Sequence, residues 1–481
     1  MTTNREPLSG NIPLARSQIL RRLGWYIAAG RASVAIAAVT LIATVTATTV
    51  AAYMDALALL FVILLSLAGL AVAMRWPTLL FYGYCAAIPL NFALPPGPAG
   101  TVARVAGVIF FIGYLVRRPH SLHPSAIPLL GWVYLGWTLI SCLWAVDTPT
   151  AFGSWLSLAQ LFGITVLIAS LVADHAETIG NALWSYTISA SLTAAISIVL
   201  YMRGVAVFGR AVVFQIGQGL QDPALFASLV LPAAVFLVGE VQSRTTSGPM
   251  RTLALASLTT CAVALALSGT RSAWVGILAA IVVWLVVQRE PRQALAVAAL
   301  VCGVATLVAI VPGIGDFLLK RVDLSIATGG AGRTDIWAVG LSILASAPLL
   351  GVGFANFGVA FTSSAIAQAP SAGGSAFVGA GAHNVLLGAL VETGLLGGVL
   401  LTTFLASAIV KPTGDRGNMI RMALISLYVQ AMFLDLLEQK QLWLFLALAF
   451  GLASSQHLAR VRGRAQPVEA VHVDARMSHH A

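Results

Sequence analysis

The sequence has few charged residues: only 9% of its 481 positions are Asp, Glu, Lys or Arg, whereas 59% are hydrophobic. So little charge excludes a soluble surface over most of the chain. Apolar runs of roughly 17 to 25 residues recur, and each can cross a bilayer core as a helix. Membrane strands would alternate polar and apolar residues, and these runs do not. We therefore expect an all-α polytopic membrane protein with about 12–14 transmembrane helices.

The expected domain organisation follows these runs. A cytoplasmic tail (1–32) precedes a helix bundle (33–311), a long periplasmic loop (312–383), C-terminal transmembrane helices (384–458) and a second cytoplasmic tail (459–481) that we expect to be disordered. The expected spans are 33–52, 55–74, 77–94, 102–116, 126–145, 153–172, 181–201, 223–239, 252–269, 272–288, 294–311, 384–410, 421–434 and 442–458.

Cysteine is scarce, and its four positions lie in apolar segments without CxxC spacing. This pattern indicates neither a disulfide framework nor a zinc site, so Cys85, Cys142, Cys261 and Cys302 are expected to be buried thiols. DxD, HExxH, Walker and GxSxG motifs are also missing, which leaves metal-dependent chemistry without support. The first 30 residues lack a short apolar core with a small-residue cleavage site, so the first span is expected to be an uncleaved anchor.

The formal net charge of +10 indicates orientation rather than nucleic-acid binding. With a cytoplasmic amino terminus, 19 of the 27 Lys and Arg residues fall on the cytoplasmic side. Both termini are therefore expected in the cytoplasm. Function is expected in the long periplasmic loop (312–383), because binding and catalytic residues are concentrated in loops. Within it, "GRTDIWAVGLSILASAPLLG" predicts an amphipathic helix that begins near Arg333 and ends at Pro348. The following Gly- and Ser-rich stretch predicts a mobile loop.

His383 is the only histidine that this topology places outside. An imidazole is the natural proton acceptor at neutral pH, although a satisfied structural histidine is an equally open interpretation. Glu392 follows nine residues later, on the opposite helix face and roughly 13 Å further along the axis. It cannot form a direct dyad with His383, and a structural role facing a helix neighbour, a polar cavity or an arginine is favoured over a catalytic one.

The external arginines form the second group of candidates: Arg203, Arg210, Arg271, Arg321 and Arg333. Guanidinium groups bind phosphate oxygens with two hydrogen bonds, and the alternative for each is snorkelling to lipid headgroups. The external acids look scattered along the sequence: Asp55, Asp147, Asp222, Asp316, Asp323, Asp335, Asp435 and Glu438. A histidine base with arginines and no metal suggests substitution on a substrate that leaves as phosphate or pyrophosphate.

Three segments, in order, resemble the bacterial O-antigen ligase and O-antigen polymerase superfamily: "SGTRSAWVG", "GRTDIWAVGLSILASAPLLGVGFANF" and "HNVLLGALVETGLLGG". The upstream "GRAVVFQIGQGLQDPALFAS" is similar to the family's arginine motif, but Gln221, Asp222 and Pro223 stand where NPN-like residues are usual. The likeness covers roughly residues 200–450.

The resemblance implies a GT-C-like, inverting, metal-independent glycosyltransferase of the bacterial inner membrane that needs no cofactor. Its donor would be an undecaprenyl-diphosphate-linked glycan, and its acceptor a hydroxyl of a lipid A core or similar molecule, as in lipopolysaccharide biosynthesis. His383 would be the base, Arg210 and Arg271 would bind the diphosphate, and Arg333 and Asn384 match supporting positions. The partners would be these two substrates and membrane lipids, with no nucleic acid.

Two alternatives stay open. A polymerase would join lipid-linked repeats with the same motifs, because it differs from a ligase only in its acceptor. A lipid-linked saccharide transporter or flippase would instead be expected to show paired halves, interrupted helices and ionisable groups near the membrane midplane. The sequence shows no clear halves and few charges inside its apolar runs.

Overall fold

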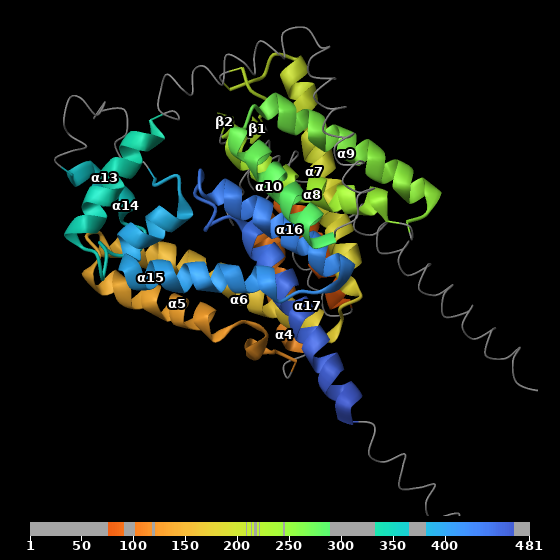
Figure 1. The fold of residues 1–481 in the computed structure, drawn as a ribbon, viewed down its shortest axis with the longest axis horizontal. Helices are drawn as coiled ribbons and strands as arrows, with labels where there is room; N and C mark the ends of the chain where they lie inside the picture. The colour runs from red at the N-terminus through yellow and green to blue at the C-terminus, as the bar shows by residue number, and fades with distance from the viewer. Residues whose placement is uncertain are drawn as a thin grey trace, which may run out of the picture.

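A computed structural model of the chain describes residues 76–90, 102–117, 121–207, 209–212, 214–215, 219–220, 222–243, 246–288, 332–364 and 381–465 (Figure 1). Almost all of the secondary structure in these residues is helical. The α-helices are α3 (Pro77–Leu90), α4 (Val102–Arg117), α5 (Leu129–Ser141), α6 (Thr148–Asp174), α7 (Thr178–Met202), α8 (Pro223–Gln242), α9 (Gly248–Ser268), α10 (Arg271–Gln288), α13 (Arg333–Ser346), α14 (Phe357–Ser363), α15 (Val385–Val410), α16 (Gly414–Ala431) and α17 (Lys440–Ala465). Two 3-10 helices, η1 (Pro124–Ala126) and η2 (Cys142–Trp144), and a small hairpin of β1 (Phe214–Gln215) and β2 (Gly219–Leu220) complete the described part.

The fold is an all-α, multi-pass membrane protein, as expected. Six of the described helices are long and apolar enough to cross a membrane: α6, α7, α8, α9, α15 and α17. Four shorter apolar helices, α3, α4, α5 with η2, and α10, match further predicted spans. The predicted spans 33–52, 55–74 and 294–311 lie outside the described residues, as do residues 1–75 and 466–481, so the total number of spans stays a prediction.

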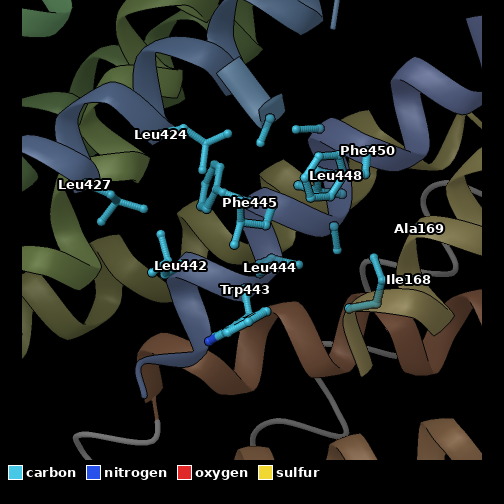
Figure 2. Close-up of a cluster of buried hydrophobic side chains, with 14 of the residues drawn as sticks. Ile168, Ala169, Leu424, Leu427, Leu442, Trp443, Leu444, Phe445, Leu448 and Phe450 are labelled. Carbon is cyan, nitrogen blue, oxygen red and sulfur yellow. The ribbon is translucent and has the colours of Figure 1, made fainter. Parts of the chain in front are cut away.

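Helix α17 lies at the centre of the bundle. Every residue from Gln441 to Phe450 is buried, which is the pattern of a helix surrounded on all sides. It packs along α6 and also contacts α16, α15 and α3. Figure 2 shows Trp443, Phe445 and Phe450 among aliphatic side chains of the neighbouring helices. We call this cluster, with Tyr186 and Phe404 packed against these rings, the α17 core.

One end of the bundle gathers several helix starts. The carbonyl of Pro223, at the start of α8, accepts a hydrogen bond from Thr270, which precedes α10. Gln430, near the end of α16, donates to the carbonyl of Ala224 in α8. Asp222 caps α8 by accepting from the N–H of Ala224 at 2.6 Å. We call this the His383 end, because His383 precedes α15 there and contacts the connection between α16 and α17.

A small helical unit stands at this end, at the left of Figure 1. Its own hydrophobic cluster joins α13, α14 and the first turns of α15, through Ile336, Phe357 and Val391 among others. We call it the α13–α14 unit. The predicted helix after residue 332 is present as α13, but α14 lies where the sequence indicated only loop. The rest of the Gly- and Ser-rich stretch, residues 365–380, lies outside the described residues, as do 312–331.

The predicted span 384–410 is present as α15 but is not continuous, because Gly394 breaks it with φ 70° and ψ −175°. The loop after α13 runs beside this break. Val352 and Gly353 donate to the carbonyls of Val391 and Glu392 at 3.0 and 2.8 Å, and Leu395 donates to Pro348 at 2.9 Å. A Cβ on Gly394 would collide with the carbonyl of Leu349. Only glycine therefore permits this backbone approach.

The prediction of buried thiols is confirmed for the three cysteines that the structure describes. Cys85, Cys142 and Cys261 are free thiols and are buried. Cys302 lies outside the described residues.

Candidate functional site

His383 is held in a strained backbone conformation, with a positive φ of 47°. A non-glycine residue in this region is uncommon and points to a constrained site. The next residue fixes the start of α15: the Asn384 side chain accepts from the N–H groups of Leu386 and Leu387 at 3.0 and 3.1 Å. Asn384 is thus the N-cap of α15 and fixes the position of His383, the residue before it. This is a physical basis for the supporting role predicted for Asn384.

Asp435, in the connection between α16 and α17, lies against His383. Its Oδ2 accepts from the His383 backbone N–H at 3.1 Å and stands 3.7 Å from Nδ1 of the ring. Nδ1 is buried and makes no hydrogen bond, yet 38% of the side chain is exposed. The exposed surface therefore belongs to the rest of the ring.

Arg210 is anchored at the junction of α9 and α10. Its Nε donates to the carbonyl of Ser268 at 2.6 Å, and its Nη2 donates to Oγ1 of Thr270 at 2.9 Å. Gly269, with φ 57°, ends α9 in the left-handed conformation, and Arg271 begins α10. The structure thus places Arg210 beside the residue that precedes Arg271, at the N-terminus of α10, where the helix dipole favours negative charge.

Arg333 begins α13, and its charge responds to residues of both groups. Burial lowers the pKa of its guanidinium, the positive charge of Arg271 lowers it further, and the carboxylates of Asp222 and Asp435 act in the opposite direction. Arg333 therefore stands close to the arginine junction and to the carboxylate behind His383. Two of the external acids that are far apart in the sequence, Asp222 and Asp435, thus both act on the pKa of this one arginine.

Glu392 does not join His383. The backbone N–H groups of Phe357 and Ala355 point at its carboxylate, the former at 3.2 Å from Oε1. The sequence suggested a helix neighbour, a polar cavity or an arginine, and the structure instead gives it the backbone of the α13–α14 unit. Asn356, fully buried between these residues, exchanges hydrogen bonds with Asp147 before α6, at 2.6 Å from its Oδ1 and 3.3 Å from its Nδ2. Glu392 thus holds α14 against α15, and Asn356 fastens the unit to the bundle.

The structure brings together five of the six residues predicted from the sequence: His383, Asn384, Arg210, Arg271 and Arg333. The residue that the sequence missed is Asp435, which lies 52 positions after His383. Its only signal was its place among polar residues between two spans. A histidine beside a carboxylate can take a proton from a hydroxyl, and guanidinium groups can stabilise an anionic leaving group.

Comparison with known proteins finds a family match over part of the chain. Residues 256–402 match a family model described as O-antigen ligase. The matched segment contains Arg271, Arg333, His383, Asn384 and Glu392, whereas Arg210 and Asp435 lie outside it. No curated protein matches the chain. The resemblance to the O-antigen ligase superfamily that the motifs indicated is thus confirmed over residues 256–402.

Proposed function

We propose that this protein transfers a glycan from an undecaprenyl-diphosphate carrier to an acceptor hydroxyl, at the outer face of the bacterial inner membrane. The family match supports a membrane enzyme of the O-antigen ligase or polymerase type. The finer statements, namely the donor, the inverting course, independence of metals, the GT-C architecture and cytoplasmic termini, stay predictions from the sequence.

The observation that carries the proposal is the pairing of His383 with Asp435 beside the arginine junction. In the proposed reaction the free ring nitrogen of His383, Nε2, accepts the proton of the acceptor hydroxyl. The hydroxyl oxygen attacks the anomeric carbon, and the bond from that carbon to the diphosphate oxygen breaks. Asp435 faces Nδ1 and stabilises the imidazolium that forms.

The arginines would receive the leaving diphosphate. Arg271 begins α10, and Arg210 is fixed by two hydrogen bonds at the same junction. Guanidinium donors that are already oriented lower the cost of developing negative charge without rearranging during the reaction. Arg333, between Arg271 and Asp435, would keep the anionic leaving group on the arginine side of the site. Asn384 and Glu392 would support the site by holding the start of α15 and the α13–α14 unit.

The test is His383→Ala in the full chain, with membrane insertion confirmed, assayed for transfer of a lipid-linked glycan. We expect about a 1,000-fold loss, because removal of a general base typically costs 10²–10⁴-fold. The matched control is His175→Ala. His175 also faces a carboxylate, with Nδ1 3.2 Å from Oε1 of Glu177, but it lies between α6 and α7. The His175→Ala variant should therefore transfer the glycan at the wild-type rate. Full activity of His383→Ala would end the proposal of a histidine base.

The alternative of a polymerase shares every residue discussed, so a deletion strain must distinguish it. Loss of a ligase should leave long polymer on the carrier, whereas loss of a polymerase should leave single repeats on the final acceptor. A transporter would be indicated by an inactive wild type that still translocates the lipid-linked glycan.

A further inference from the structure

Two aromatic rings stand beside the His383–Asp435 pair without a part in the proposed reaction. Trp337 lies in α13, and Phe433 lies in the connection after α16. Their ring centroids are 6.2 Å apart, with an interplanar angle of 39°. Both side chains are partly exposed, although Trp337 also packs on the hydrophobic cluster of the α13–α14 unit. The pair is therefore covered on one side and open on another.

Local structure places these rings in the site. Trp337 follows Arg333 by four positions, so both side chains lie on the same face of α13. Arg333 stands near Arg271 and Asp435. The indole N–H of Trp337 donates to the carbonyl of Ala382 at 3.1 Å, directly before His383. Phe433 precedes Asp435 by two residues. Trp337 is thus bonded to the residue before His383, and Phe433 lies in the same connection as Asp435.

We infer that Trp337 and Phe433 form a stacking site for a pyranose ring of the lipid-linked glycan. This inference rests on the proposed function, which supplies the glycan as substrate. A pyranose presents a face of C–H bonds with partial positive charge, and an aromatic face is negative, so the two attract each other. Apolar ligand-binding walls with a few oriented polar groups are the usual composition of such sites.

Stacking would complement the arginines. The guanidinium groups fix the diphosphate, whereas the rings fix the plane of the sugar, so that the anomeric carbon is turned toward the nitrogen of His383. Contact through C–H bonds requires a sugar face that carries axial hydrogens, but it requires no hydrogen bond to a particular hydroxyl group. The site would therefore accept different pyranoses, and each good stack is expected to strengthen binding by up to about tenfold.

The experiment compares two ligands on the full-length protein in phosphatidylcholine nanodiscs. One is undecaprenyl diphosphate, and the other is the same lipid carrying N-acetylglucosamine, whose equatorial substituents leave axial C–H bonds on both faces. We expect the wild type to bind the sugar-bearing lipid about tenfold more tightly. Phe433→Leu keeps an apolar side chain and breaks no hydrogen bond of the described structure. This variant should bind the two lipids with equal affinity, and its affinity for undecaprenyl diphosphate should equal that of the wild type.

Two controls separate stacking from a structural role. Phe433→Tyr keeps the ring and should keep the ratio. Trp144→Leu removes a similar tryptophan, bonded to the carbonyl of Leu350 at 3.3 Å and 5.7 Å from the ring of Trp137, and should also keep it.

Each contrary result has a distinct meaning. Equal ratios in the wild type and Phe433→Leu would overturn the stacking site. Equal binding of both lipids by the wild type would overturn it too, while the diphosphate proposal would stand. Binding of neither lipid would remove the proposed function and the stacking site together.

Discussion

The α17 core and the α13–α14 unit are held together by different means. In the core, aromatic and aliphatic side chains pack around a helix buried on every side, as with Tyr186 against Phe445 at 5.5 Å. The unit is instead fastened by backbone hydrogen bonds across the break at Gly394 and by the polar side chains Asn356 and Glu392. Packing is spread over many contacts, whereas the fastening depends on a few atoms.

This difference separates stability from function. His383 starts α15 in the unit, while Asp435 belongs to the connection that leads into α17. The His383–Asp435 pair therefore forms only when the unit is docked on the bundle. Changes to the fastening should reduce activity more than stability, and changes to the core should do the reverse.

The contact between His383 and Asp435, which links the two regions, should be the most sensitive to mutation. Asp435→Asn replaces the carboxylate that faces Nδ1 with an amide, which cannot stabilise an imidazolium equally. We expect about a 1,000-fold loss of transfer, comparable with loss of the base. The measurement is kcat in reconstituted membranes. Glu438→Gln, in the same connection, is the control and should stay within threefold of wild type. Retained activity of Asp435→Asn would show that the base works without its carboxylate.

The fastening itself is tested by Gly394→Val. The new side chain would collide with the Leu349 carbonyl at a φ of 70°, so the loop after α13 cannot dock as it does now. We expect about a 100-fold loss of transfer, because small misplacements of a catalytic group can cost this much. Limited proteolysis should show faster cleavage near residues 347–356.

A glycine in the same helix gives the control for this change. A Cβ on Gly388 would meet the Cβ of Ala382 at 3.4 Å, an ordinary contact. Gly388→Ala should therefore behave as wild type. If Gly394→Val were as active as Gly388→Ala, the fastening would not govern the site.

The arginine junction should show an intermediate effect. In Arg210→Lys the charge stays, but the ammonium lacks the planar fork whose Nε and Nη2 donate to Ser268 and Thr270. We expect about a tenfold rise in KM for the lipid-linked donor, since the cation would no longer be held in place. Arg203→Lys, exposed at the end of α7, is the control. An unchanged KM would argue against a diphosphate contact by Arg210.

Glu392 allows a graded test of the fastening. Glu392→Leu removes the acceptor for the Phe357 N–H and should destabilise docking by about 1–3 kcal/mol. Glu392→Gln keeps a side-chain oxygen and should lose less than threefold in activity. Transfer assays of both variants decide the matter. If Gln were as damaging as Leu, the carboxylate would have a role beyond accepting backbone hydrogen bonds.

The smallest effect on activity is expected in the core. Phe445→Leu removes an almost fully buried ring and should lower the free energy of unfolding by about 1–2 kcal/mol. Thermal unfolding in detergent would measure this loss, while transfer at low temperature should remain near wild type. A large loss of activity without loss of stability would contradict the separation of core and site.

Much of this architecture could be predicted from sequence because membrane spans are local features. Apolar length alone identified α6 to α10, α15 and α17, within a few residues at most ends. His383 could be singled out by topology, and Arg271 and Arg333 by the order of motifs. α14 was missed because a helix of seven residues carries too little periodic pattern to be recognised.

The sequence by itself determined that this chain is an all-α membrane protein of several passes, because low charge and long apolar runs leave few alternatives in a bilayer. It also determined which histidine and arginines deserved testing. Only the tertiary structure decided that Asp435 stands behind His383, that Glu392 binds backbone and not the base, and that Trp337 meets Phe433. These pairings join residues 35 to 96 positions apart, and such contacts depend on helix packing and on one glycine break that no local pattern specifies.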